Sequence, residues 1–147
     1  MKKQAIRSFT ILGLLLVMSA VSVRAQSQRN EVTKIPFSFI VGDKTLPAGA
    51  YRIEPNSRNY DKVWLVQSSD GDASALFSTI PTRSFETQEK SKLVFRKYGD
   101  QYFLSQVWTA GGNTGRELLI PRLEHVLAKS KIDRETVVVV IGSQSRN

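Results

Sequence analysis

The stretch from residue 37 to residue 54 places the strongest constraint on what this chain can fold into. Large apolar side chains recur at every second position from Phe37 to Val41, which is the pattern of a half-buried strand. The sequence LPAG at 46–49 then has the chemistry of a tight turn, because proline pre-sets the backbone and Gly49 can take a positive φ. Residues 51–54 return as a second strand. An all-β opening is therefore predicted, with its first strand at 35–41.

Residues 1–25 have the organisation of a secretory signal peptide. Three basic residues precede an apolar run from residue 9 to residue 21, and Ala25 supplies a small residue for cleavage. The run is shorter than the roughly 20 residues that a membrane-spanning helix needs, so cleavage is favoured over an uncleaved anchor. The sequence predicts a signal peptide at 1–25, no transmembrane segment after its removal, and a single β-rich domain at 26–147.

The basic character of the chain comes partly from this leader. Residues 1–25 contain four of the 21 lysines and arginines and no acid, so their removal leaves 17 basic residues against 13 acidic ones and lowers the formal net charge from +8 to +4. A mild excess of this size favours solubility and contact with anionic surfaces. We expect no binding of nucleic acid.

Further strands follow the opening pair. Residues 62–67 and 73–80 are predicted to form a hairpin across Asp70-Gly71, since this dipeptide adopts turns that match strand twist. Pro81 is expected to end the second of these strands, and the polar residues 82–90 to form a loop.

The segment 92–108 is the other well-defined hairpin. Strands at 92–98 and 101–108 are joined by Gly99-Asp100, and a two-residue turn pairs positions whose numbers sum to 199. Phe95 then lies opposite Leu104, and apolar side chains occur on both faces. The hairpin is therefore predicted to be covered on both sides.

The C-terminal part contains one helix. After a glycine-rich loop at 110–115, Pro121 can occupy a first helical turn, and apolar residues recur at helical spacing. We expect this amphipathic helix to close one end of the β-core. The β-branched run 137–141 is predicted to be a buried final strand. The apolar positions of the helix are Leu123, Val126 and Leu127.

The predicted fold class is all-β. A single antiparallel meander of about seven strands would form a small barrel or sandwich, with one short C-terminal helix and a final strand.

No catalytic, cofactor or metal site is predicted. The chain has no cysteine and one histidine, His125, so it lacks the residues of the usual zinc and copper sites and of a Ser-His-Asp arrangement. Aromatic rings with a polar tip can pack in a core or stack on a ligand. Four such residues are candidate ligand contacts: Trp64, Tyr98, Tyr102 and Trp108.

Two motifs resemble a family of small exported bacterial proteins of uncharacterised function. These motifs are IPFSFIVGDKTLPAGAY at 35–51 and KYGDQYFL at 97–104. The resemblance covers most of the chain after the leader and implies a signal peptide and a compact β-domain, without an activity. The succession of strands, helix and last strand is also similar to lipocalins in topology, although the Gly-x-Trp signature of lipocalins is absent.

These features predict an exported soluble β-domain, periplasmic or extracellular, that acts as a non-catalytic binding or envelope-associated module. Its partners would be components of the cell envelope or a small apolar ligand. The alternatives are a lipocalin-like carrier of a small apolar ligand, which needs a closed cavity lined by aromatic residues, and a small secreted hydrolase, which needs acids or His125 at a concave site.

Overall fold

The computed structural model of the chain describes residues 32–56, 62–130 and 132–142, all of which belong to one unit, Glu31–Asn147. The predicted signal peptide at 1–25 lies outside these residues.

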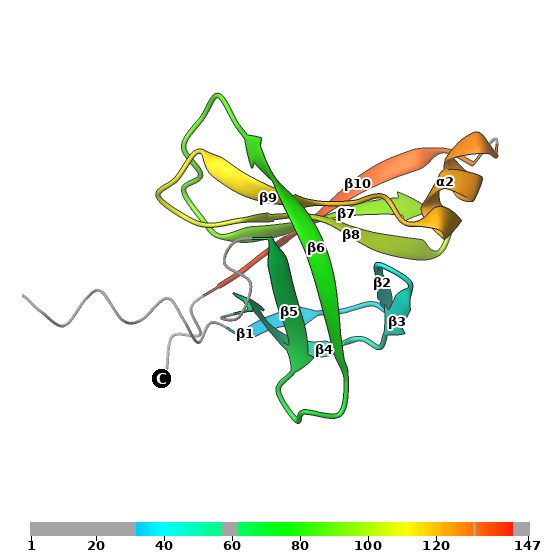
Figure 1. Cartoon of the computed structure of the whole chain (residues 1–147), viewed down its shortest axis with the longest axis horizontal. Coiled ribbons are helices and arrows are strands. Elements are labelled where there is room, and N and C mark those ends of the chain that lie inside the picture. The colour runs from blue at the N-terminus through cyan, green and yellow to red at the C-terminus, as the bar shows by residue number, and fades with distance from the viewer. Residues whose placement is uncertain (1–31, 57–61, 131, 143–147) are drawn as a thin grey trace, which may run out of the picture. The chain divides into compact units, whose positions relative to one another are not determined.

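Two β-layers share one long strand (Figure 1). The first layer has the order β1-β4-β5-β6, and the second continues from β6 through β9 and β8 to β7 and β10. A hairpin, β2–β3, joins the second layer through a parallel pairing of Ile40 in β2 with Phe103 in β8. The strands are β1 (Val32–Ile35), β2 (Phe39–Val41), β3 (Lys44–Leu46), β4 (Gly49–Pro55), β5 (Val63–Ser68), β6 (Ser74–Arg83), β7 (Lys92–Tyr98), β8 (Gln101–Trp108), β9 (Thr114–Leu118) and β10 (Arg134–Val140).

This architecture confirms the all-β class with a C-terminal helix and corrects its details. The described residues form ten strands instead of about seven, and the sheet is open. It is sandwich-like, so the predicted barrel is wrong. It is also not a plain antiparallel meander, because β2 pairs in parallel with β8 and lies far from it in sequence.

Strand β6 changes partner in its middle, which explains why Pro81 does not end it. Residues 74–78 pair with β5, and residues 79–83 pair with β9. The Thr79 amide donates to the carbonyl of Lys62, just before β5, at 2.7 Å, so odd-numbered residues of β6 point their backbone groups away from β9. β5 begins at Val63, so no residue of this strand lies opposite Pro81. The missing amide hydrogen therefore costs no bond in the β5 or the β9 ladder.

The opening segment contains more strands than predicted. The expected strand at 35–41 is interrupted at residues 36–38 and divided into β1 and β2, and β1 begins at Val32, three residues before the predicted start. The tight turn lies at Gly42, whose φ is +60°, and not at 46–49. Gly49 has no positive φ; it begins β4 and pairs with Ile35. The predicted role of Gly49 is therefore wrong.

The β7–β8 hairpin confirms the predicted register over its first four pairs, from Tyr98 with Gln101 to Phe95 with Leu104. One extra residue, Ser105, then shifts the register in a β-bulge, and its hydroxyl donates to Val94 O at 2.9 Å. Both faces of the hairpin are covered, as expected.

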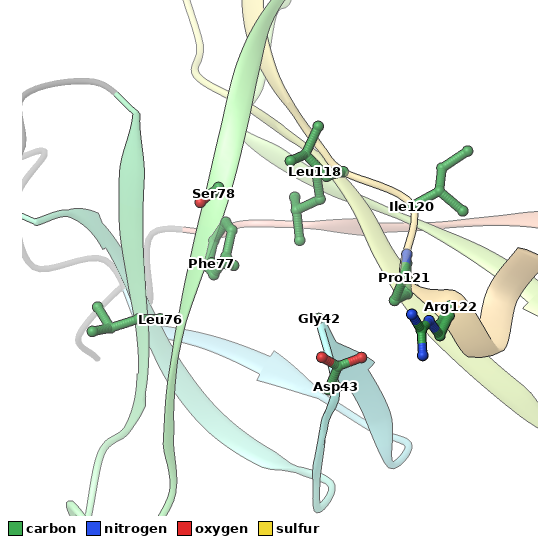
Figure 2. Close-up of a pocket in the computed structure, with 10 residues that line it drawn as sticks. Gly42, Asp43, Leu76, Phe77, Ser78, Leu118, Ile120, Pro121 and Arg122 are labelled. Atoms are coloured by element: carbon green, nitrogen blue, oxygen red, sulfur yellow. The ribbon is translucent and has the colours of Figure 1, made fainter.

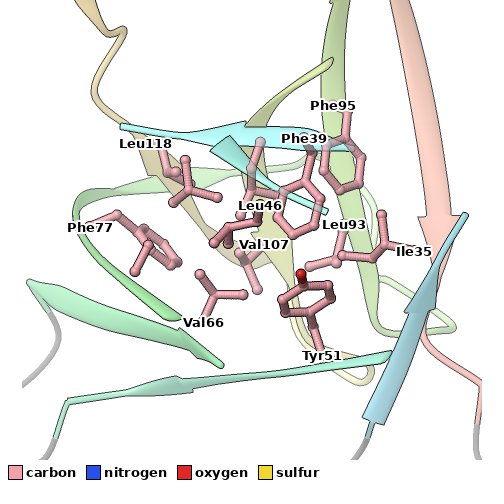
Figure 3. Close-up of a cluster of buried hydrophobic side chains, with 13 residues drawn as sticks. Ile35, Phe39, Leu46, Tyr51, Val66, Phe77, Leu93, Phe95, Val107 and Leu118 are labelled. Carbon is pink, nitrogen blue, oxygen red and sulfur yellow. The ribbon is translucent and has the colours of Figure 1, made fainter. Parts of the chain in front are cut away.

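The main core lies between the two layers (Figure 3). Aromatic rings meet edge to face at its centre, with the Phe39 centroid 5.0 Å from that of Tyr51 and 5.7 Å from that of Phe95. Such contacts add to the stabilisation from burial. The fully buried members are Ile35, Phe39, Val41, Leu46, Tyr51, Val66, Leu93 and Phe95.

Two C-terminal predictions about strands are wrong. Residues 114–118 form β9 between β6 and β8, so the predicted loop at 110–115 is wrong at its last two residues. The valine run forms β10, an edge strand that pairs with β7 and, among the described strands, with no other. Its Val138 and Val140 are about half exposed, so the strand is not buried. A continuous run of valines cannot by itself distinguish a central strand from an edge.

The predicted helix is present as α2 (Arg122–Lys129). Its buried side is the one that carries Glu124, and not the one that carries Leu123 and Val126. Leu123 and Val126 are exposed, whereas Glu124 is 1% exposed and turned toward the sheet. Leu127, which is half buried, packs against a small second cluster on the far face of β8. The helix covers the sheet there through Leu127 and Glu124, whereas Leu123 and Val126 of the predicted apolar stripe stay exposed.

Candidate functional site

An open groove of about 620 Å³ lies where β9 leaves β6 and turns toward α2 (Figure 2). This volume is within the range of roughly 300–1,000 Å³ that is usual for ligand sites. Its walls come from the β2–β3 turn, from the first half of β6, and from the connection between β9 and α2. The lining residues are Gly42, Asp43, Leu76, Phe77, Ser78, Leu118, Leu119, Ile120, Pro121 and Arg122.

The floor of the groove includes an unpaired strand edge. Bonds from Ser68 N to Ala73 O and from Thr79 N to Lys62 O show that odd-numbered residues of β6 face β5. The backbone groups of Leu76 and Ser78 therefore point away from β5, and the β9 ladder begins at Thr79. Because Thr79 faces β5, its pairing with Leu118 places the Ser78 carbonyl beside Leu119 at the end of the β9 ladder. In the part of the chain that the structure describes, the open edge therefore consists of the outward groups of Leu76 and the Ser78 amide, for which no hydrogen bond is found.

The β2–β3 hairpin forms one wall because its tip is tied to β6. Gly42 allows the turn, since φ near +60° is open to glycine at little cost. The Lys44 ammonium then donates to Ser74 O at 2.6 Å, which uses the outward carbonyl at the start of β6. This bond holds Asp43, at the tip, over the groove.

A second open hollow of about 740 Å³ lies on the outer side of the same hairpin. Asp43 and Leu76 line both hollows, so the exposed Leu76 side chain marks their common border. The other lining residues of this second hollow are Val41, Lys44, Asn56, Leu65, Ser74 and Ala75.

Opposite charges lie at the mouth of the groove. Figure 2 shows the Asp43 carboxylate and the Arg122 guanidinium on the same side of the open space, one from the hairpin tip and the other from the start of α2. Both are exposed. Between them the wall is apolar, with Phe77 and Leu118 buried beneath. The groove therefore offers apolar contacts, backbone hydrogen-bonding groups and one charge of each sign.

The four aromatic candidates do not line either hollow. Trp64 is half buried against the main core, and Tyr102 stacks on Phe37 with centroids 4.0 Å apart. Trp108 is buried and donates to Gln106 Oε1 at 3.0 Å. Tyr98 belongs to the second cluster with Phe103. The structure thus distributes these side chains over separate packing contacts.

The acids and the histidine are also dispersed. Glu124 is held by Arg96, whose Nε lies 2.5 Å from Oε1 and whose Nη2 donates to Oε2 at 3.4 Å; Tyr98 donates to Oε1 at 3.3 Å. His125 is exposed on α2. Among the described lining residues of the groove, Asp43 is the one carboxylate, and within residues 32–56, 62–130 and 132–142 no cluster of potential metal ligands occurs.

Displaced pKa values occur away from the groove. Burial raises the pKa of the Tyr51 hydroxyl, which donates to Pro47 O at 2.7 Å. The Ser68 hydroxyl and, secondly, the Asp72 amide lower the pKa of Asp70 in the β5–β6 turn. A hydrogen bond to Glu135 raises the pKa of Lys97. None of these groups lines either hollow.

Comparison with known proteins finds no matching family model, no matching curated protein and no matching solved structure. In the described part of the chain, no helix has the length and apolar character needed to cross a membrane.

Sequence reasoning missed the groove because it arises from contacts between distant segments. Leu76 and Ser78 looked like ordinary strand residues, and nothing local shows that β6 has lost its second partner there. The length of β6, ten residues against six in β5, requires another neighbour, but the sequence does not reveal it because Pro81 is expected to end the strand.

Proposed function

We propose that the domain is an exported, non-catalytic binding module that takes up an extended polypeptide segment in the groove beside β6. The observation that carries the proposal is the outward edge at Leu76 and the Ser78 amide, which lies in the groove just before the β9 ladder begins. An extended segment can add to such an edge through backbone hydrogen bonds, while pockets for alternate side chains give selectivity.

The surroundings of the edge fit this mode of binding. Phe77, Leu118 and Ile120 offer apolar contact to alternate side chains of an added strand. Asp43 and Arg122 can attract a basic and an acidic residue at different points along it. A lipocalin-like carrier has less support, because the sheet is open and aromatic rings fill the space between the layers.

A displayed library of random peptides, selected on the protein, supplies a probe. The affinity of a selected peptide is then measured for Ser78→Pro and for the matched control Ser78→Ala. Proline removes the outward amide and leaves the β5 ladder intact, whereas alanine removes the hydroxyl alone. We expect about tenfold weaker binding or more for Ser78→Pro, and binding close to wild type for Ser78→Ala.

Folding of both variants is checked by their melting temperatures. A folded Ser78→Pro protein that binds the peptide as tightly as wild type would contradict strand addition at β6. So would selected peptides whose binding shifts the amide resonances of other segments and leaves 76–78 unchanged.

A further inference from the structure

We infer that the surface formed by Leu119, Ile120, Leu123 and Val126 together with Arg122 and Lys129, here called the α2 surface, binds an anionic lipid surface. The four apolar side chains are 58%, 44%, 46% and 64% exposed. They occur from the end of β9 into the helix, which places an exposed apolar strip on a short segment of the chain. Such a strip marks an interaction site more often than single exposed residues do.

The orientation of α2 is what leaves this strip exposed. The helix contains one acid, Glu124, and its carboxylate is drawn into the protein by Arg96 and Tyr98. At 100° per residue, Leu123 and Val126 point about 100° and 160° away from Glu124. Fixing the acid inward therefore turns both apolar residues outward.

Burial of the acid also leaves the exposed side of α2 without negative charge. Arg122 and Lys129 are exposed and lie next to Val126 on the helix, about 40° and 60° around it. His125 is exposed as well. The nearest exposed acid along the chain, Asp133, lies beyond the helix and is followed by Arg134.

Apolar residues flanked by cations complement an anionic membrane surface. Helices of this kind lie in the plane of the interface, where the apolar face enters the acyl boundary and lysine or arginine contacts the headgroups. A second copy of the chain complements the strip less well, because two identical α2 surfaces would bring their cations together. The charge therefore favours lipid as the occupant.

The test is hydrogen exchange on the full-length chain, with and without vesicles. Mixed vesicles of phosphatidylglycerol and phosphatidylcholine should slow exchange in the peptide that covers residues 119–129, and vesicles of phosphatidylcholine alone should not. This local readout separates α2 from the apolar run at 9–21. Equal protection by both kinds of vesicle, or none, would overturn the inference, as would protection that rises with protein concentration without lipid, which points to a second copy.

Two pairs of substitutions make the test specific. Leu123→Ser with Val126→Ser should weaken binding to the anionic vesicles about tenfold, and Arg122→Gln with Lys129→Gln should remove its dependence on salt. The matched control is Ile80→Ser with Val138→Ser, which are about half exposed on other strands and should leave binding unchanged. If the control pair weakened vesicle binding as much as the serine pair on α2, a site on α2 would be contradicted.

The inference does not rest on peptide binding. Ser78→Pro should leave vesicle binding unchanged, and the two serines on α2 should leave selected peptides bound, provided that those peptides do not contact Leu123 or Val126. Failure of one assay alone therefore identifies which proposal is wrong.

Discussion

The β7–β8 hairpin is covered on one side by aromatic rings and on the other by a helix that is held through charges. Alternation along the two strands creates both faces from the same seventeen residues. The main-core face consists of Leu93, Phe95, Leu104 and Val107; the helix face consists of Arg96, Tyr98 and Phe103.

The two faces differ in how much their packing contributes to the stability of the fold. The main-core face meets another β-layer, and its side chains are buried among rings that belong to three strands. On the helix face, Tyr98 and Phe103 form a small buried cluster with Ile40 of β2. A buried ion pair lies beside this cluster. We infer that the main-core face supplies most of the stability, and that the helix face determines how α2 is oriented.

The largest expected effect compares two phenylalanines that are almost fully buried on opposite faces. Phe95→Ala should lower the free energy of unfolding by about 3–5 kcal/mol, and Phe103→Ala by roughly 2–4 kcal/mol, because the smaller cluster can relax into the space. Urea denaturation of the two variants gives the measurement. A greater loss for Phe103→Ala would reverse the ranking of the faces.

The next effect concerns the ion pair. Glu124→Gln keeps the shape and removes the charge, which leaves the Arg96 side chain, 14% exposed, with Glu117 at 3.8 Å as its remaining acidic partner. We expect a loss of about 2–3 kcal/mol, below the range for a completely buried pair. A double-mutant cycle with Arg96→Met checks it, since the two changes should be far from additive. Additive losses would show that the pair does not hold α2.

These two faces also show what the sequence could and could not reveal. The hairpin, its turn and four of its pairings follow from alternation and Gly99-Asp100, which are local. The bulge at Ser105 is not visible locally. The orientation of α2 depends on Arg96 and Glu124, which are 28 residues apart, so the apolar stripe was assigned to the wrong side.

The candidate site was less predictable than the fold for the same reason. The groove needs β6 to pair with β9 after β5, and the sequence predicts a loop at 110–115, which includes the first two residues of β9, Thr114 and Gly115. A Cβ on Gly115 would lie 2.6 Å from the Trp108 ring, so this glycine serves close packing against the ring. Aromatic residues were sensible candidates, but their rings fill contacts within and around the core.

A smaller effect on stability tests the β2–β3 hairpin, which contributes a side chain to the cluster on each face of the β7–β8 hairpin. β2 sends Phe39 into the main core and Ile40 into the helix-side cluster, and the turn at Gly42 fixes it there. Gly42→Ala should cost about 1–2 kcal/mol, because an L-residue is strained at φ near +60°. Gly49→Ala is the matched control and should change stability by less than about 0.5 kcal/mol.

Thermal melts of both glycine variants decide between the two turns. The Cβ added at Gly49 would approach Tyr51 to 3.4 Å, an ordinary contact distance. A larger loss of stability for Gly49→Ala than for Gly42→Ala would indicate that the strained turn lies at residues 46–49. That result would contradict the observed conformation of this segment.

The smallest expected effect lies at the open end of the hairpin, where Lys97 donates to Glu135 of β10 at 3.2 Å. This hydrogen bond and the charge of Glu135 raise the pKa of Lys97 above its ordinary value. A raised pKa in the folded state means that the contribution is fully present below the unfolded pKa of roughly 10.4 and is lost as pH rises through the folded value. The Glu135 side chain is 63% exposed and that of Lys97 25%, so solvent and salt screen the pair and its contribution is small. Glu135→Gln should therefore melt slightly below wild type near neutral pH, and the difference should disappear as pH rises through the raised pKa of Lys97. A difference that stays constant across this range would show that the charge on Lys97 does not link β7 to the edge strand.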